Sequence, residues 1–319
     1  MKASPPSPET MRRSSGPPPV CGIVVTFFPD TKLQERIEVI GAECDHVVVV
    51  DNGSPAGTLA FLAQSDHLEL LVQSSNVGLA AAFNVGLRRA LLLGYKWAVT
   101  FDQDSEPVAG MVKELWLSHE RNPGAAVIGP CIEEAGSNSV YRWVRRHPRC
   151  GWFFQRVECG NDDLTNITLL ISSGSLTDLE MWSRLGGFDE DFFIDYVDSD
   201  YCLKVLRSGR GLVVSALARM RHRLGGRRTG RFLGRNLRPM HHATFRHYYM
   251  ARNRVKVWRR HAWAVPHWAS FDLAFVCLNS FRVVIFEPSK WKKFKATLLG
   301  TWDGVKARNC SRPEYRPQV

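Results

Sequence analysis

The stretch Trp97-Ala98-Val99-Thr100-Phe101-Asp102-Gln103-Asp104-Ser105 joins a short apolar run to two carboxylates one residue apart. The run has the length of a buried strand, and we predict a strand over residues 97–101. In open α/β sheets, ligands bind just beyond the carboxyl ends of the strands. The segment has no Lys or Arg to pair with Asp102 and Asp104, so it predicts a site for Mg²⁺ or Mn²⁺ carrying a substrate's phosphates. A turn in which Asp and Ser cap the next helix is the structural alternative.

Strands and helices alternate before this stretch. Apolar, β-branched runs predict strands over residues 20–27, 47–50 and 68–72. Residues 32–40 and 79–94 have the apolar spacing of helices. A fully apolar strand implies a sheet covered on both faces, so we predict a doubly wound, mostly parallel α/β sheet. No G-x-G-x-x-G follows the first strand, which counts against the nucleotide-binding dehydrogenases.

Beyond the stretch, we expect a loop over residues 133–160 and a strand over residues 169–175. The loop has a basic and aromatic middle, which can bind single-stranded nucleic acid but is more typical of a flap or of core packing. The strand would end in Ser173 and Gly174, whose small size lets a backbone approach a ligand closely. His222 follows a further predicted strand over residues 211–217, and imidazole is a common ligand for Mn²⁺-like ions.

Six acids lie between Asp189 and Asp200, interleaved with aromatic side chains. Acids at a helix N-terminus commonly cap its free N–H groups, which is the structural interpretation of any one of them. Asp198 is expected in the first turn of a helix that ends near Gly209. A carboxylate beside apolar Phe193 and Ile194 acquires a raised pKa and can act as a general base.

Charge is distributed unevenly along the 319 residues. From Leu203 to the end there are 26 Lys and Arg against 4 Asp and Glu, whereas the first 202 residues have 16 against 27. The basic half predicts a polyanionic partner: nucleic acid, anionic lipid headgroups or a diphosphate. The eight cysteines include no C-x-x-C pair, which predicts reduced, mostly buried thiols rather than a zinc site or a disulfide framework.

Three regions follow from composition. Residues 1–19 contain six prolines and four serines and predict a disordered tail without a secretory h-region. Residues 20–255 would form the catalytic domain. Residues 256–319 are rich in Trp, Arg and Lys but have no run of roughly 20 apolar residues, so they predict amphipathic helices in a membrane interface, with lysines on anionic lipid. A helical cap on the catalytic domain is the alternative.

Together these motifs resemble glycosyltransferase family 2, inverting enzymes of the Rossmann-like GT-A fold that use sugar nucleotides. The order and spacing of the markers carry the resemblance between Val20 and Asn253. The markers are residues 26–29, 50–54, 76–78, 84, 102–105, 171–174, 186–190 and 195–201. The forms Asp-Gln-Asp-Ser and Phe-Ile-Asp-Tyr-Val-Asp-Ser-Asp are similar to the rhamnosyltransferase branch, which builds bacterial surface polysaccharides such as O-antigen.

The resemblance implies a cytoplasmic enzyme, peripheral on the inner face of the membrane. It would move L-rhamnose from dTDP-L-rhamnose to a lipid-linked or polysaccharide acceptor. Other donors on the same scaffold, such as UDP-galactofuranose or UDP-glucose, remain alternatives, since both pyrimidine bases present the same imide edge. A non-catalytic nucleic-acid-binding protein is the alternative of a different class. It would explain the basic half but not carboxylates at the ends of successive strands.

The resemblance also implies roles for single residues. Asp198 corresponds to the catalytic base, although Val197 replaces the acid that commonly precedes it. Asp104 would ligate Mg²⁺ or Mn²⁺, and His222 would complete the metal site. The residues implied on the donor side are Thr26, Asp51, Asn76, Gly78, Asp102 and Arg252. Those placed on the acceptor side are Ser173, Gly174, Asp195 and Tyr196.

Overall fold

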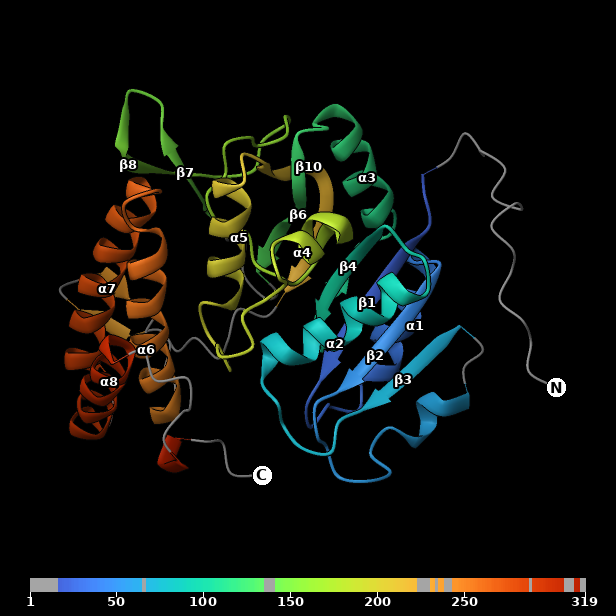
Figure 1. Cartoon of the computed structure of the whole chain (residues 1–319), viewed down its shortest axis with the longest axis horizontal. Helices are drawn as coiled ribbons and strands as arrows, with labels where there is room; N and C mark the ends of the chain where they lie inside the picture. Colours follow the sequence, from blue (N-terminus) through green and yellow to red (C-terminus); the bar gives the residue numbers. More distant parts are fainter. Residues whose placement is uncertain are drawn as a thin grey trace.

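A single eight-stranded sheet organises the chain, with the strand order β3-β2-β1-β4-β9-β6-β10-β5 (Figure 1). The computed structural model describes residues 17–64, 67–134, 141–222, 230–232, 235–237, 243–286, 289–306 and 313–315. The strands of the sheet are β1 (Val20–Thr26), β2 (His46–Asp51), β3 (Leu68–Val72), β4 (Trp97–Asp102), β5 (Glu106–Pro107), β6 (Ala125–Glu134), β9 (Ser175–Asp178) and β10 (Gly211–His222).

The sheet is mostly parallel, as the sequence predicts. β1 pairs in parallel with β2 and β4, β2 with β3, and β6 with β10, whereas β9 and β5 run antiparallel to their neighbours. The register aligns Val24 with both Val49 and Phe101, and all three side chains are fully buried. Burial of these central strands on both faces explains why they read as continuous apolar runs.

Helices cover both faces of the sheet. The first three are α1 (Leu33–Glu43), α2 (Leu79–Leu92) and α3 (Met111–Arg121), followed by α4 (Leu179–Arg184) and α5 (Val197–Arg207). α1 contacts α3, whereas α2 packs on β1, β2 and β4 and lies in front of the strands in Figure 1. The carboxyl ends of β1, β2 and β4 and the N-terminus of α5 carry the residues of interest, which makes this end of the sheet the site.

Three C-terminal helices form a separate layer beside the sheet, coloured orange to red in Figure 1. They are α6 (Thr244–His261), α7 (Pro266–Phe286) and α8 (Lys290–Val305). α8 packs closely on α6. The absence of a side chain at Gly304 allows this approach, since a Cβ there would lie 2.7 Å from the carbonyl oxygen of Arg252. The predicted domain boundary at 255/256 falls within α6. Within the described ranges, no helix is both long and apolar enough to cross a membrane.

Two predicted elements are corrected by the structure. Residues 133–160 are not a loop throughout: β7 (Trp143–His147) and β8 (Cys150–Val157) form an antiparallel hairpin, and β8 contacts α7. The strand expected over 169–175 instead begins at Ser175 and runs antiparallel between β4 and β6. The small residues before it therefore lie at the entry of a strand rather than at its end.

The remaining elements are short. The structure also contains the turns of 3₁₀ helix at Ala60–Gln64 and Pro313–Tyr315 and a two-stranded ribbon of β11 (Gly230–Phe232) with β12 (Arg235–Leu237).

The prediction of reduced thiols is wrong for one pair of cysteines. Cys131 and Cys159 form a disulfide with their Cα atoms 6.1 Å apart. The sequence has no spacing signal for this pair, which β6 and the segment after β8 bring together.

Candidate active site

The carboxylate of Asp51, at the end of β2, is nearly fully buried and held from both sides. Its Oδ1 accepts hydrogen bonds from Ser54 Oγ at 2.6 Å and Thr26 Oγ1 at 3.3 Å, and its Oδ2 accepts from the Ser54 backbone N–H at 3.1 Å. This orients an acceptor group at the carboxyl ends of β1 and β2. Such a group can accept the imide N–H of a pyrimidine base.

Asn76 and Gly78 build the turn into α2. Asn76 Oδ1 accepts from Asn52 Nδ2 at 3.1 Å and from the Gly78 backbone N–H at 3.0 Å. Gly78 has φ of +91°, and a Cβ there would lie 2.8 Å from the carbonyl oxygen of Phe193. The Leu79 N–H donates to that same carbonyl at 2.8 Å. These two residues therefore link the strand ends to the acidic segment, and Asn52, which the sequence analysis missed, shares in this role.

The end of β4 presents Asp102 and Asp104, both half-buried. Gln103, between them, accepts the Phe27 backbone N–H at 2.8 Å through its side-chain oxygen, which ties the end of β1 to the end of β4. Ser173 is buried, accepts the Asp102 N–H at 3.3 Å and contacts the Ser105 hydroxyl. We therefore assign Ser173 to holding the end of β4.

Gly174 is also explained by packing. It has φ of +78°, and a Cβ would lie 2.7 Å from Met220 Sδ and 2.8 Å from Pro130 Cγ. Its backbone N–H donates to Thr100 O at 2.6 Å. Glycine is required here because β9 must turn in tightly beside β4, and the close neighbours are core side chains rather than a ligand.

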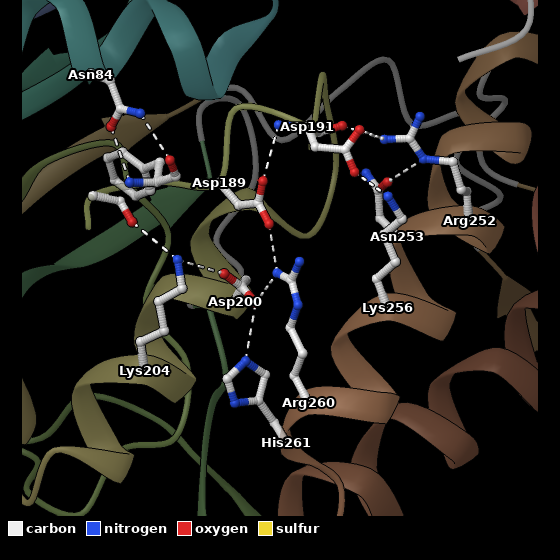
Figure 2. A network of polar contacts seen from close by, with 12 residues as sticks. Asn84, Asp189, Asp191, Asp200, Lys204, Arg252, Asn253, Lys256, Arg260 and His261 are labelled. Atoms are coloured by element: carbon white, nitrogen blue, oxygen red, sulfur yellow. Dashed lines mark hydrogen bonds and ion pairs between the residues drawn. The ribbon is translucent and has the colours of Figure 1, made fainter. Parts of the chain in front are cut away.

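The acidic segment is held to α6 by a network of ion pairs (Figure 2). Asp189 pairs with Arg260 at 2.6 Å, and Asp191 pairs with Arg252 and Lys256. Fully buried Asp200 accepts from His261 Nε2 at 3.0 Å and also contacts Lys204 and Arg260.

The other acids of the segment divide into paired and unpaired. Glu190 pairs with Arg88 at 3.1 Å, and Asp195 is bound bidentately by Arg246. Among the described residues Asp198 alone of the six has no cationic partner; its Oδ1 accepts the Ser199 N–H at 2.8 Å. Five of the acids are therefore held by ion pairs rather than by capping free helix N–H groups, and Asp198 stands apart.

Asp198 is placed in the first turn of α5, as predicted. Burial, together with the negative charges of Asp102 and Asp195, raises the pKa of its carboxyl to about 6, although the Ser199 N–H acts to lower it. Asp102 at the end of β4 and Asp198 at the start of α5 are thus close enough for their charges to interact. A carboxylate with a pKa near 6 is ionised at neutral pH yet basic enough to accept a proton.

Arg252 is a correction. Its side chain is 1% exposed, its guanidinium pairs with Asp191 and donates to the Asp191 carbonyl, and its Nε donates to Asn253. A guanidinium buried in this way is committed to the fold, so we reassign it from the donor diphosphate to support of the acidic segment (Figure 2).

The metal donor set is only partly visible. Within the described residues, no three His, Cys, Asp or Glu side chains converge on one point. Asp102 and Asp104 nevertheless fit an ion such as Mg²⁺, which proteins bind through one or two carboxylates together with substrate phosphates. β10 pairs Arg221 with Glu106 of β5, which places the backbone of His222 beside the segment that follows Asp104. The side chain of His222 lies outside the described part of the chain.

Comparison with known proteins agrees with this geometry. Residues 23–185 match the family model described as glycosyl transferase family 2. The chain is 27% identical to the dTDP-rhamnosyl transferase RfbF of Shigella flexneri, over 90% of this chain and 95% of that protein. It is also 26% identical over 150 residues to an uncharacterised protein of Mycobacterium tuberculosis, covering 46% of this chain and 54% of that protein.

Solved structures share the fold at low sequence identity. Staphylococcus aureus TarS, residues 1–349, superposes with a TM-score of 0.60 and 13% identity, over 91% of this chain and 82% of that one. GalNAc-T7, solved with UDP, GalNAc and Mn²⁺, superposes with a TM-score of 0.59 and 13% identity, over 77% of this chain and 48% of that one.

Proposed function

Because the chain belongs to glycosyl transferase family 2, and is therefore a glycosyltransferase, we propose that it transfers L-rhamnose from dTDP-L-rhamnose with inversion at the anomeric carbon. The similarity to a dTDP-rhamnosyl transferase over nearly the whole chain supports the donor. The buried, oriented carboxylate of Asp51, with Thr26 beside it, supports recognition of a pyrimidine nucleotide. UDP-galactofuranose and UDP-glucose are the alternative donors, since uracil presents the same edge to Asp51.

The single observation that carries the mechanism is the carboxylate of Asp198, which has no cationic partner among the described residues and whose pKa is raised by burial. Asp198 takes the proton from an acceptor hydroxyl, whose oxygen forms the new bond to C1 of the sugar. The bond from C1 to the diphosphate oxygen breaks, and its electron pair leaves with the nucleoside diphosphate. A single displacement of this kind inverts the anomeric centre.

Asp104 and Asp102, with His222, are the residues proposed to hold Mg²⁺ or Mn²⁺. When bound, the ion neutralises charge on the leaving diphosphate. The paired backbones of β10 and β5 bring these chain positions together, which supports the assignment.

The C-terminal helices support peripheral attachment to an anionic membrane surface and a lipid-linked or polysaccharide acceptor. α8 exposes an apolar stripe, which we call the outward stripe: Trp291, Phe294, Leu298, Trp302 and Val305. Lys292 and Lys295 flank it and are exposed. A pocket of about 570 Å³ opens beside it, between α6, α7 and α8, with Val276, Val283 and Phe294 in its lining. Aromatic and apolar side chains beside lysines suit an interface with anionic lipid, at the inner face of the membrane.

The basic half of the chain does not favour nucleic acid as a partner. Arg252, Lys256 and Arg260 of α6 are engaged with the acids of residues 189–200, so their charge is neutralised within the fold (Figure 2). A sequence-independent nucleic-acid surface requires such cations on phosphates.

The test is turnover by the purified full chain across dTDP-L-rhamnose, UDP-galactofuranose and UDP-glucose, with Mn²⁺ or Mg²⁺ and with EDTA. We expect metal-dependent turnover of dTDP-L-rhamnose, and a loss on the order of 10²–10⁴ in rate for Asp198→Asn. Asp162→Asn, at an exposed position, is the matched control. Turnover of a UDP-sugar alone would overturn the donor, and near wild-type rates in a folded Asp198→Asn would overturn the base.

A further inference from the structure

The turn that precedes Asp198 has an unusual backbone. Asp195 and Tyr196 both lie in the left-handed region, with φ of +64° and +63°, and neither is glycine. Each such residue costs roughly 1–3 kcal/mol and persists only where surrounding contacts impose it. Tyr196 is also the N-cap of α5 and makes no side-chain capping bond there. Something outside the turn must hold it.

The contacts that hold this turn come from the C-terminal helices. Asn253 of α6 is fully buried, and its Nδ2 donates to the carbonyl oxygens of Ile194 and Asp195, each at 2.9 Å. Arg246, also of α6, binds the Asp195 carboxylate through two nitrogens. Both helix residues are 50 or more positions away in sequence, so the turn is set by tertiary contact.

Asp272 of α7 completes the arrangement from a second helix. It is 3% exposed and accepts from the Tyr196 hydroxyl at 2.6 Å and from Trp258 Nε1 at 2.6 Å. Arg254 Nε donates to the Tyr196 hydroxyl at 3.1 Å and lies 3.6 Å from Asp272. A buried acid with three partners is costly to disturb, since removing it leaves those donors unpaired.

The same turn forms one wall of a small pocket. The pocket is about 240 Å³, with Tyr196 and Ser199 on one side and Trp268, Asp272 and Phe275 of α7 in its lining. Ser199 is the residue whose N–H binds the Asp198 carboxylate. The position of α7 therefore bears on both the turn and the space beside the base.

We infer that Asp272 is a positioning residue for the proposed base: through the Tyr196 hydroxyl it fixes the left-handed turn, and hence the direction of Asp198. This inference rests on the proposed role of Asp198. It assigns to α6 and α7 a part in the chemistry, in addition to any contact with a membrane.

The first experiment does not depend on activity. Hydrogen–deuterium exchange is measured on the full-length wild type, Asp272→Asn and Tyr196→Phe. The matched control is Tyr95→Phe, in the turn before β4 at the opposite end of the strand from Asp102. We expect amides of residues 194–199 to exchange at least about tenfold faster in the two test variants and unchanged in the control. Faster exchange confined to α7, with 194–199 unchanged, would overturn the inference.

The second experiment uses the donor that the wild type turns over. Since a 1 Å misplacement of a reacting group can cost about 100-fold, we expect both test variants to lower kcat by about tenfold to 100-fold with the donor KM unchanged. Unchanged kcat would overturn the positioning role. Failure of the wild type on dTDP-L-rhamnose would instead count against the proposed donor, and the exchange experiment would still decide the role of Asp272.

Discussion

Asp198→Asn should make the protein more stable at neutral pH while lowering its proposed activity by a factor on the order of 10²–10⁴. Burial, with a smaller effect of Asp102 and Asp195, raises the Asp198 pKa from 3.8 to about 6. The folded state therefore binds this proton more tightly than the unfolded state. The stability contributed by Asp198 is complete below pH 3.8 and is lost as pH rises through 6. A shift of about two pKa units corresponds to about 3 kcal/mol at pH 7.5, which the neutral amide avoids.

Asp200→Asn, two residues further along α5, should have the opposite effect. Burial alone would raise the Asp200 pKa, but the hydrogen bond from His261 and the charges of Lys204 and Arg260 lower it to about 2. Its contribution to stability is therefore present above pH 3.8 and is lost as pH falls through 2. The pKa difference corresponds to about 2 kcal/mol, and leaving the cations without their buried partner raises the expected loss to about 3–5 kcal/mol at pH 7.5.

The assay is urea unfolding of wild type, both variants and the exposed control Asp162→Asn, without donor and in EDTA, from pH 4 to pH 7.5. The gain for Asp198→Asn should grow by about 2 kcal/mol across this range. Asp200→Asn should be less stable than wild type throughout, and the control should stay within about 0.5 kcal/mol. A gain for Asp198→Asn that is absent or independent of pH would refute the argument that its carboxylate is held at a cost for function.

Three further predictions test other parts of the site. Gly78→Ala should lower stability more than Gly94→Ala, because both have positive φ but only a Cβ at Gly78 meets neighbouring atoms; strain alone costs about 1–3 kcal/mol, and thermal unfolding compares them. Trp291→Ser should weaken sedimentation with anionic vesicles several-fold, whereas Leu92→Ser, at an equally exposed position of α2, should not. Asp104→Asn should reduce the dependence of dTDP binding on Mn²⁺ in calorimetry, and equal dependence would reject it as a ligand.

The central strands can be predicted from the sequence because strands buried on both faces consist of continuous apolar runs. The apolar runs at 20–27, 47–50 and 97–101 become β1, β2 and β4 with little change of boundary. Asp102 and Asp104 fall at the end of β4 for the same reason: a buried strand ends where charge begins. The mostly parallel sheet and the family are confirmed.

Elements whose bounds depend on contacts with distant parts of the chain cannot be predicted from local sequence in this way. β8 has consecutive exposed aromatics at Trp152 and Phe153, so it lacks the alternation of a half-buried strand. The run at 169–171 is apolar because it packs against the core without pairing in the sheet, and strand pairing starts only at Ser175. Local pattern cannot distinguish these cases, since the deciding partners lie elsewhere in the chain.

The acidic segment shows the same limit within the site. From spacing alone, any of the six acids could cap free helix N–H groups, and Asp198 could be a base. Their division follows from α6, whose Arg252 and Arg260 lie at least 60 residues further along and pair with Asp189, Asp191 and Asp200. The excess of basic residues after Leu203 was interpreted as a sign of a polyanionic partner. Part of it instead balances the acidic excess of the first half within the fold.

The contact between Asp272 of α7 and Tyr196 changes how membrane attachment should be tested. Deleting residues 261–319 removes the outward stripe of α8, but it also removes Asp272 and the helix that holds Tyr196. We therefore expect such a deletion to lose turnover even with a water-soluble acceptor, for a reason unrelated to lipid. Substitutions at Leu298, Trp302 and Val305 of the outward stripe separate the two effects, because these side chains are exposed and lie outside the lining of the pocket between α6, α7 and α8, which leaves the contacts to Asp272 in place. If stripe variants lose vesicle binding and keep turnover of a soluble acceptor, the C-terminal layer serves attachment and chemistry through different faces of the same helices.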